Sequence, residues 1–101
     1  MILVRNIFQV KFGQARDAIA AWKKGLAIAE RLGNSRGRYR LLTDLAGPDF
    51  YTLVLEGTYE SLAEFEQAGQ ALMGSPEWQA WYPQVLALSE GGRREILNIV
   101  E

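Results

Sequence analysis

Cysteine and histidine are both absent from this chain of 101 residues. Without cysteine, the protein has no disulfide, no zinc–thiolate site and no cysteine nucleophile. Without histidine, it has no serine–histidine triad, no histidine-ligated haem and none of the imidazole sites that hold most transition metals. These absences exclude most metal centres and several classes of hydrolase, and we expect neither a metal nor a cofactor.

Long hydrophobic runs and an excess of charge of one sign are missing as well. No apolar run approaches the ~20 residues that a membrane helix requires. The net charge of -1 argues against electrostatic binding to nucleic acid or to an anionic membrane, since both kinds of binding need clustered Lys and Arg. The first residues, Met1 to Val4, carry no basic lead and no small-residue cleavage site. We therefore expect a strand there instead of a signal peptide, and a cytoplasmic protein.

The length and the hydrophobic share of 49% suit one compact domain over residues 1–101. A domain of this size buries only about two-thirds of the surface that its unfolded chain exposes. Its stability margin is therefore thin, and association with a second copy would increase it.

Hydrophobic periodicity predicts four strands and two helical stretches. Alternating apolar residues indicate strands, and apolar residues at spacings of three and four indicate amphipathic helices. The glycine pair Gly91–Gly92 predicts a loop before the last strand. The predicted strands are residues 2–12, 37–45, 50–59 and 93–100, and the predicted helices are residues 14–32, with a stop signal at 33–34, and 61–74, followed by a short helix from residue 75.

Local signals mark the ends of these helices. Ser61 with Glu64 matches a capping box, and Ser75 is placed to cap the short helix. Pro83 should kink or end that short helix. Gly25 lies inside the first helix, where glycine costs up to about 1 kcal/mol relative to alanine. We expect Gly25 to mark the place where this helix passes close to the sheet.

The order strand, helix, strand, strand, helix, strand is the ferredoxin-like βαββαβ plan, an α+β fold. Right-handed crossovers place the strands in one four-stranded antiparallel sheet with the helices on one face. The other face keeps apolar residues whichever side of each strand meets the helices, for example Leu3 and Ile7 or Val4 and Phe8. A large exposed apolar face marks an interaction surface, and its simplest cover is the same face of a second copy. We therefore expect a homodimer.

Three stretches resemble the dimeric α+β barrel superfamily: residues 10–14 (VKFGQ), 59–65 (YESLAEF) and 75–79 (SPEWQ). The last two are similar to the NIPSNAP-type branch, with the antibiotic biosynthesis monooxygenase (ABM) branch as a near relative. The resemblance implies a barrel built from the sheets of two protomers, with a small-molecule site in each protomer between sheet and helices. Several members are monooxygenases without metal or flavin. Others degrade haem, but the haem-binding histidine of that branch has no counterpart here.

Asn6 interrupts an otherwise apolar strand face. A buried amide without a partner would cost about 1–3 kcal/mol, so its side chain should form a hydrogen bond. The partner is either neighbouring backbone or water, or a small ligand that the amide orients. An asparagine does similar work in the haem-degrading and polyketide-oxidising branches of the superfamily, and Asn6 looks similarly placed.

Trp78, Trp81 and Tyr82 form an aromatic cluster close to one face of the short helix. Core packing is the ordinary role of such residues, and a stacking wall for a flat apolar ligand is the alternative. The resemblance adds to the second role, because the monooxygenase branch also has a tryptophan near its substrate pocket. Trp22 lies in the apolar stripe of the first helix, and we assign it to the core.

Arg38 and Arg40 share one face of the second strand. They either guard an edge strand or bind a carboxylate or phenolate, with Arg93–Arg94 joining them across a dimer seam. Glu56 on the third strand either pairs with an arginine of an adjacent strand or acts as a general base in an apolar pocket. Tyrosines that could donate to a ligand oxygen are Tyr39, Tyr51 and Tyr59.

These observations leave two main functions open. The first is cofactor-independent oxygenation of a small aromatic or enolisable substrate, with Asn6 holding the substrate anion and aromatic walls excluding water. The second is a non-catalytic small-molecule-binding or assembly module, which the lack of a convincing general base favours. A third, a peptide-binding module that adds a strand at the sheet edge, predicts an open edge, whereas the dimer predicts a closed one.

Overall fold

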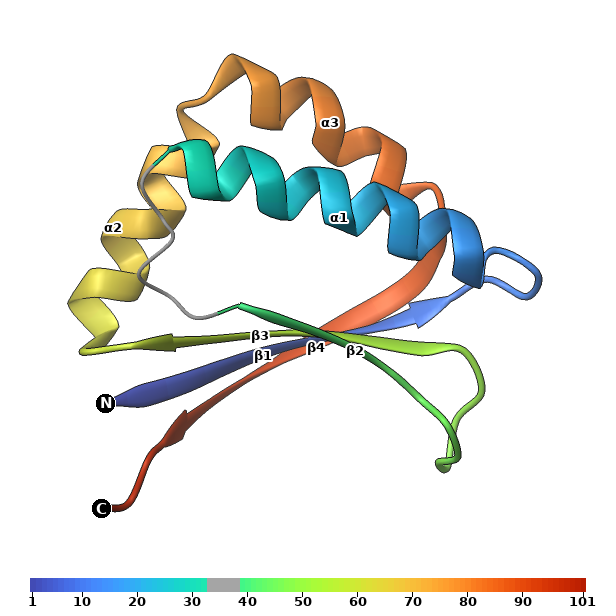
Figure 1. Ribbon diagram of the computed structural model, residues 1–101, viewed down its shortest axis with the longest axis horizontal. Coiled ribbons are helices and arrows are strands. Elements are labelled where there is room, and N and C mark those ends of the chain that lie inside the picture. Colours follow the sequence, from blue (N-terminus) through green and yellow to red (C-terminus); the bar gives the residue numbers. More distant parts are fainter. Residues whose placement is uncertain (33–38) are drawn as a thin grey trace.

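The structure is a computed structural model that describes residues 1–32 and 39–101. Its elements follow the predicted βαββαβ order, with the second helical connection divided into two helices at Gly74 (Figure 1). The predicted stop signal at residues 33–34 and the candidate Arg38 lie outside the described residues. The elements are β1 (Ile2–Val10), α1 (Ala15–Arg31), β2 (Arg40–Thr43), β3 (Thr52–Tyr59), α2 (Leu62–Met73), α3 (Pro76–Leu86) and β4 (Ser89–Asn98).

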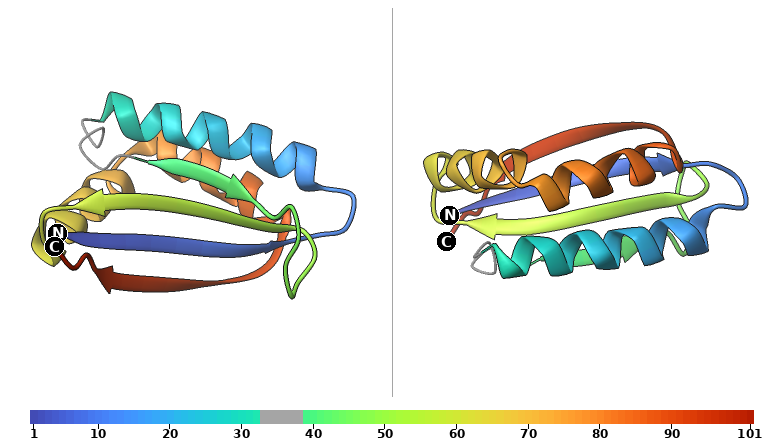
Figure 2. Two further views of the ribbon diagram at one scale, coloured as in Figure 1. Left: turned by 60° about the horizontal axis from the view of Figure 1, so that its bottom comes forward. Right: turned by 90° about the horizontal axis from the view of Figure 1, so that it is seen from above.

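The four strands form one antiparallel sheet in the order β2-β3-β1-β4, so β1 and β3 are central and β2 and β4 are the edges. Helices α1, α2 and α3 lie on one face of this sheet and leave the other face open (Figures 1 and 2). The predicted fold class is therefore confirmed. Within the described ranges, no helix is long and apolar enough to cross a membrane.

Strand register decides which side chains meet the helices. Phe8 on β1 lies opposite Leu53 on β3, and the Phe8 ring stacks on Trp22 of α1 with 5.0 Å between ring centroids. Because side chains alternate along a strand, the even-numbered residues of β1 face the helices and the odd-numbered ones face the open side. The apolar residues of the two central strands that face the open side are Leu3, Ile7 and Val54.

The open face combines apolar residues that the sequence predicted there, Leu3, Ile7 and Val54, with several polar ones. Ile7 and Val54 lie at its centre and are each only 8% exposed. Phe50, which the pattern placed on the third strand, lies in the loop before β3. The polar residues that share this face on the central strands and β4 are Arg5, Gln9, Thr52, Glu56, Thr58, Arg93 and Glu95. Leu42 of β2 and Leu97 of β4 also face this side, so the open face keeps an apolar area beside its charged side chains.

Two tryptophans from different helices meet in the core. Trp22 of α1 and Trp81 of α3 are both buried and pack edge to face with 5.1 Å between ring centroids. This confirms that Trp22 is a core residue. Gly25 of α1 contacts the Trp81 ring, so it marks a close approach of α1 to α3. The expectation that Gly25 marks an approach to the sheet is wrong, because Gly25 packs against the Trp81 ring of the neighbouring helix α3.

One helix and one hairpin extend differently from the prediction. Pro83 does not end α3, which continues to Leu86, because a proline removes a single helical N–H donor and the next turn can resume.

The β2–β3 connection spans residues 44–51 instead of a tight turn. Asp44 closes this loop through two hydrogen bonds with Thr52: its N–H donates to the Thr52 carbonyl at 3.1 Å, and its carboxylate accepts from the Thr52 N–H at 2.7 Å.

Gly91 and Gly92 belong to β4 and not to a loop. They pair with Gln9 and Phe8 of β1. A Cβ at Gly92 would lie 3.0 Å from Cδ1 of Phe8, so glycine leaves room here for the ring that packs on α1. The glycine pair is therefore a packing feature inside a strand, and the predicted loop at this place is wrong.

Both predicted N-caps are present. The Ser61 hydroxyl accepts from the Glu64 N–H at 3.2 Å, and the Ser75 hydroxyl accepts from the Trp78 N–H at 3.3 Å. The Glu64 carboxylate accepts from the Glu60 N–H at 2.7 Å, one residue earlier than in the usual capping box. These bonds satisfy helix N–H groups that would otherwise lack partners, and so they determine where α2 and α3 begin.

Candidate functional site

A pocket between the sheet and α3 brings together two of the predicted site residues, Asn6 and Tyr82. Its volume is about 480 Å³, which is in the range of small-molecule sites. Asn6 reaches this pocket because it lies on the helix-facing side of β1. The other lining residues are Phe8, Leu86, Ser89, Glu90, Gly91, Gly92, Arg93 and Arg94.

Asn6 is paired with Arg94, its cross-strand neighbour on β4. The Nε–H of Arg94 donates a hydrogen bond to Asn6 Oδ1 at 2.6 Å. From the sequence, the partner of this amide was either backbone or water, or a ligand. In the structure the partner is a charged side chain, which is a third possibility. Because the amide oxygen accepts this bond, the amide NH2 group remains a donor, beside the terminal N–H groups of Arg94. The pair therefore offers donors to the pocket.

Aromatic rings hold Arg94 in place from the α2 side. Its guanidinium carbon lies 5.2 Å from the centroid of the Phe65 ring, a cation–π contact. Phe65 packs edge-on against Tyr59, whose hydroxyl lies 3.0 Å from the hydroxyl of Tyr39. Burial raises the pKa of both tyrosines above the usual value, and for Tyr59 the nearby charge of Arg94 opposes this increase in pKa. Both hydroxyls are therefore neutral at physiological pH.

The aromatic cluster of α3 divides between core and pocket. Trp81 is buried in the core, where its indole N–H donates to the Ala21 carbonyl of α1 at 2.9 Å. Trp78 packs on Trp81 with 4.6 Å between ring centroids. Tyr82 stacks beside Trp78 at 6.2 Å, is 40% exposed and lines the pocket. A stacking wall for a ligand thus consists of Tyr82, and the tryptophans support it from behind.

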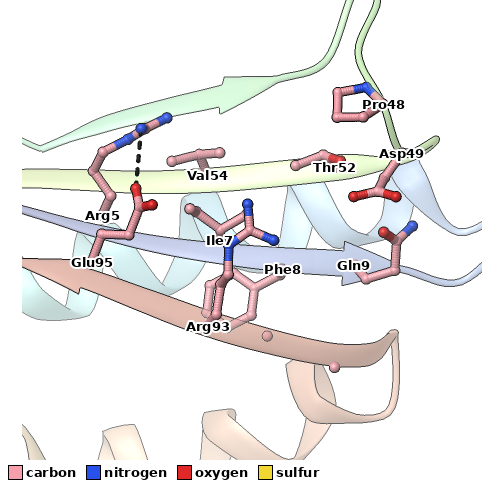
Figure 3. Close-up of a pocket in the computed structure, with 12 residues that line it drawn as sticks. Arg5, Ile7, Phe8, Gln9, Pro48, Asp49, Thr52, Val54, Arg93 and Glu95 are labelled. Carbon is pink, nitrogen blue, oxygen red and sulfur yellow. Dashed lines mark hydrogen bonds and ion pairs between the residues drawn. The ribbon is translucent and has the colours of Figure 1, made fainter.

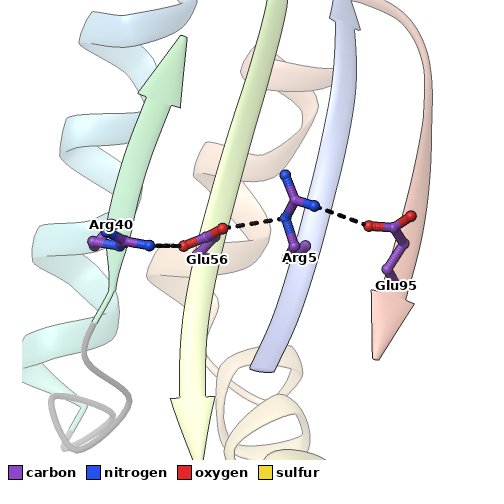
Figure 4. Close-up of polar contacts among 4 residues, drawn as sticks. All are labelled: Arg5, Arg40, Glu56 and Glu95. Atoms are coloured by element: carbon purple, nitrogen blue, oxygen red, sulfur yellow. Dashed lines mark hydrogen bonds and ion pairs between the residues drawn. The ribbon is translucent and has the colours of Figure 1, made fainter. Parts of the chain in front are cut away.

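The remaining charged candidates lie on the opposite face of the sheet. Arg40, Glu56, Arg5 and Glu95 form a straight row across all four strands, each directly opposite the next in the register (Figure 4). Glu56 Oε1 accepts from Arg40 Nη2 at 2.5 Å and Nε at 3.2 Å. Arg5 Nη1 donates to Glu95 at 3.3 Å, and Arg5 Nε lies 3.1 Å from Glu56 Oε2 without pointing its N–H at that oxygen.

This row decides between the alternatives for Glu56 and Arg40. Glu56 is 7% exposed, but it lies between two arginines and not in an apolar pocket. In the structure, Glu56 therefore pairs with arginines of the adjacent strands. Arg40 lies on the edge strand β2 and on the face away from Asn6, so the two do not share a site.

A second hollow lies on the open face next to this row (Figure 3). Its volume is about 410 Å³, and Arg5, Glu95 and Arg93 lie on one side of it, with Pro48 and Asp49 of the β2–β3 loop on another. Arg93 faces this hollow, whereas Arg94 has its side chain on the helix side, because adjacent strand residues point to opposite faces. Arg93 and Arg94 therefore serve different faces of the sheet.

Comparison with solved structures identifies the fold. A NIPSNAP domain protein from Burkholderia xenovorans superposes with a TM-score of 0.86 at 19% identity, over 99% of this chain and 95% of that one. A NIPSNAP family protein from Agrobacterium tumefaciens has a TM-score of 0.86 at 23% identity, over 99% and 86%. An antibiotic biosynthesis monooxygenase has a TM-score of 0.71 at 13% identity, over the full length of both chains. The fold is that of the NIPSNAP and ABM proteins.

This likeness bears out the resemblance seen in the sequence and is a likeness of fold. No protein-family model and no curated protein matches the chain. The residues that the structure describes contain no group of three or more Asp and Glu side chains that could hold a metal ion. The pocket residues must therefore be interpreted from their own chemistry.

Sequence reasoning missed Arg94 as a pocket residue. It placed the Arg93–Arg94 pair on a dimer seam and treated both residues alike. The available signal was the register of a paired sheet: a polar residue on the buried face of the first strand needs a partner, and a neighbouring strand with an arginine provides one. Without knowing that β1 pairs with β4 in this register, the sequence could not distinguish Arg94 from Arg93.

Proposed function

We propose that this protein binds a small, planar, anionic molecule in the pocket between the sheet and α3. The observation that carries this proposal is the Asn6–Arg94 pair, in which the hydrogen bond to Asn6 Oδ1 leaves donors on both side chains. Arg94, whose side chain lies on the helix side of β4, brings a positive charge to the pocket beside the Asn6 amide, so this part of the lining favours an anion. Phe8 and Tyr82 supply apolar ring surface, which suits a flat ligand.

Arginine and amide donors suit a carboxylate, a phenolate or an enolate. The guanidinium group has several N–H donors in one plane, which fit two oxygens of a planar anion at once. The cation–π contact with Phe65 and the bond to Asn6 limit the rotation of Arg94. A donor that is already oriented loses less entropy on binding, so this arrangement increases affinity.

Cofactor-independent oxygenation of a small aromatic or enolisable substrate is the second candidate function. In such a reaction the deprotonated substrate itself reacts with dioxygen, and the protein holds the anion in a site that excludes water. Donors that stabilise a bound carboxylate would also stabilise a phenolate or an enolate. The full-length likeness to an antibiotic biosynthesis monooxygenase supports this candidate at the level of the fold.

Calorimetric titration with two matched probes tests the binding proposal. We use 2-naphthoate, which is planar and anionic, and 2-naphthamide, which has nearly the same shape but no charge. We expect 2-naphthoate to bind at least about tenfold more tightly, and Arg94→Gln to remove the difference, since a charged hydrogen bond contributes about 1.5–3 kcal/mol. Arg16→Gln, on the exposed side of α1, is the control and should bind like the wild type. Equal binding of both probes would contradict the proposal.

Oxygen consumption separates binding from turnover. Native mass spectrometry first detects any small molecule that copurifies, as extra mass on the protein. This molecule is then incubated with the ligand-free protein under air in an oxygen-electrode cell. Consumption that needs the folded protein and decreases in Arg94→Gln supports oxygenation. Binding without consumption supports the non-catalytic module.

We also propose that two copies associate through their open sheet faces, in the cytoplasm. The helices cover one face of the sheet and leave the other without cover (Figure 2). Ile7 and Val54 lie at the centre of that open face, framed by charges of both signs. A self-complementary surface of this kind suits an isologous contact between identical chains.

A further inference from the structure

We propose that the row Arg40–Glu56–Arg5–Glu95 determines the register in which two copies of this chain pack sheet against sheet. The inference rests on the self-association proposed above and adds its geometry. The row crosses the strands β2, β3, β1 and β4 in a straight line on the open face (Figure 4). Its charges alternate as plus, minus, plus, minus, and its net charge is zero.

An alternating row of four charges changes sign when it is read in reverse. A two-fold axis parallel to the strands, passing between β3 and β1, places the reversed row of one copy over the row of the other. Each Arg40 then faces a Glu95 of the second copy, and each Glu56 faces an Arg5. Every charge of the row meets its opposite, and no like pair arises.

The other in-plane two-fold axis gives the reverse result. An axis perpendicular to the strands places each residue of the row over the same residue of the second copy. Arg40 then faces Arg40 and Glu95 faces Glu95, so four contacts between like charges arise in a poorly solvated layer. Like charges held together at an interface are strongly unfavourable, so the row selects the first arrangement against the second.

The side chains are suited to this task. Facing sheets pack about 10 Å apart, a gap that arginine and glutamate side chains from the two sides can span together. The members of the row are already paired within one chain, so none enters the interface as an isolated charge. The same axis places edge β2 of one copy over edge β4 of the other, in antiparallel orientation.

An inverted row provides the test. The variant R5E/R40E/E56R/E95R has the opposite sign at every position, but it keeps the alternation within the chain and its self-complementarity. Wild type and variant should therefore each form homodimers, while a mixed dimer would place like charges over one another. Because the four changes leave the mass unchanged, the variant is labelled with 15N. Both chains are mixed, unfolded in urea, refolded together and measured by native mass spectrometry.

We expect mixed dimers to fall well below the half that random pairing produces. Random pairing, or an excess of mixed dimers, would overturn the inference while leaving the self-association and the ligand pocket intact. A wild-type protein that stays monomeric would overturn the self-association and the register together, whereas the ligand titration would be unaffected.

A single substitution keeps the inference testable if the inverted chain does not fold. Glu95→Arg should weaken the homodimer about tenfold in sedimentation equilibrium, because the introduced arginine would face Arg40 of the second copy. Mixing it with Arg40→Glu should restore association as a mixed dimer. Glu66→Arg, on the exposed side of α2, is the matched control and should associate like the wild type. If Glu95→Arg and Glu66→Arg dimerise equally, the register does not depend on the row.

Discussion

Gly25 of α1 and Trp81 of α3 are in direct contact: a Cβ at Gly25 would lie 2.5 Å from Cη2 of the Trp81 ring. This contact lets the two helices approach until the indole N–H donates to the Ala21 carbonyl at 2.9 Å. A glycine inside a helix costs up to about 1 kcal/mol relative to alanine. The close packing of the Trp81 ring offsets that cost.

Gly25→Ala should lower the free energy of unfolding by about 1–3 kcal/mol, because the added methyl group overpacks the contact with Trp81. Gly69→Ala on α2 is the matched control. A Cβ at Gly69 meets no atom within 4 Å, so this change should raise the free energy of unfolding by about 0.5–1 kcal/mol. Urea unfolding followed by tryptophan fluorescence measures both. Two changes of the same sign would contradict the packing argument.

Glu56→Gln should destabilise the protein by about 1–3 kcal/mol. The substitution removes a mostly buried carboxylate that lies between Arg5 and Arg40, and leaves the two guanidinium groups without their shared partner. This loss of stability is smaller than for a fully buried pair, because both arginines are partly exposed. Urea unfolding at low protein concentration measures the change, with Glu66→Gln on α2 as the control. A loss no larger than that of the control would show that the row adds nothing to the stability of the single chain.

The Tyr39–Tyr59 pair predicts a loss of stability at alkaline pH. Burial raises the pKa of both tyrosines in the folded protein. The unfolded chain releases these protons near pH 10, before the folded protein does, so the contribution is present below pH 10 and is lost as the pH rises above it. Each raised tyrosine should lower the free energy of unfolding by up to about 1 kcal/mol per pH unit in that range.

Tyr59→Phe tests this prediction. The variant should lose about 1 kcal/mol at pH 8, because the hydrogen bond to Tyr39 is gone. Between pH 10 and pH 11 its stability should decrease less steeply than that of the wild type. Tyr82→Phe keeps the pair intact and should show the wild-type slope. Parallel slopes for Tyr59→Phe and the wild type would mean that Tyr59 does not cause the loss.

Asn6→Leu should weaken the binding of 2-naphthoate about tenfold and keep the fold. Leucine removes the amide donor and the acceptor that orients Arg94, but it lies on a strand face that is otherwise apolar. Calorimetric titration measures the affinity, and circular dichroism checks the fold. Asn98→Leu, at the end of β4, is the control and should bind like the wild type. Unchanged binding by Asn6→Leu would show that the amide takes no part in binding the ligand.

The fold could be predicted from the sequence because its signals are local. The alternation along residues 2–10, the stripe that includes Trp22 and the caps Ser61 and Ser75 each depend on neighbours along the chain. The predictions that failed depend on contacts between distant segments. Gly25 and Gly92 were assigned from their backbone properties, whereas each of them makes room for an aromatic ring from another element.

The candidate site was predicted less completely, and the reason is register. Asn6 and Tyr82 were found from their residue types and do lie in one pocket, but the sequence alone also grouped Trp81 and Arg40 with them. By itself, the sequence determined the βαββαβ order, the helix starts and the absence of sites that need cysteine or histidine. Only the tertiary structure decided that Arg94 belongs to Asn6 and Arg40 to Glu56. A shift of one residue in strand pairing moves every side chain to the other face of the sheet, and that shift leaves no trace in composition or periodicity.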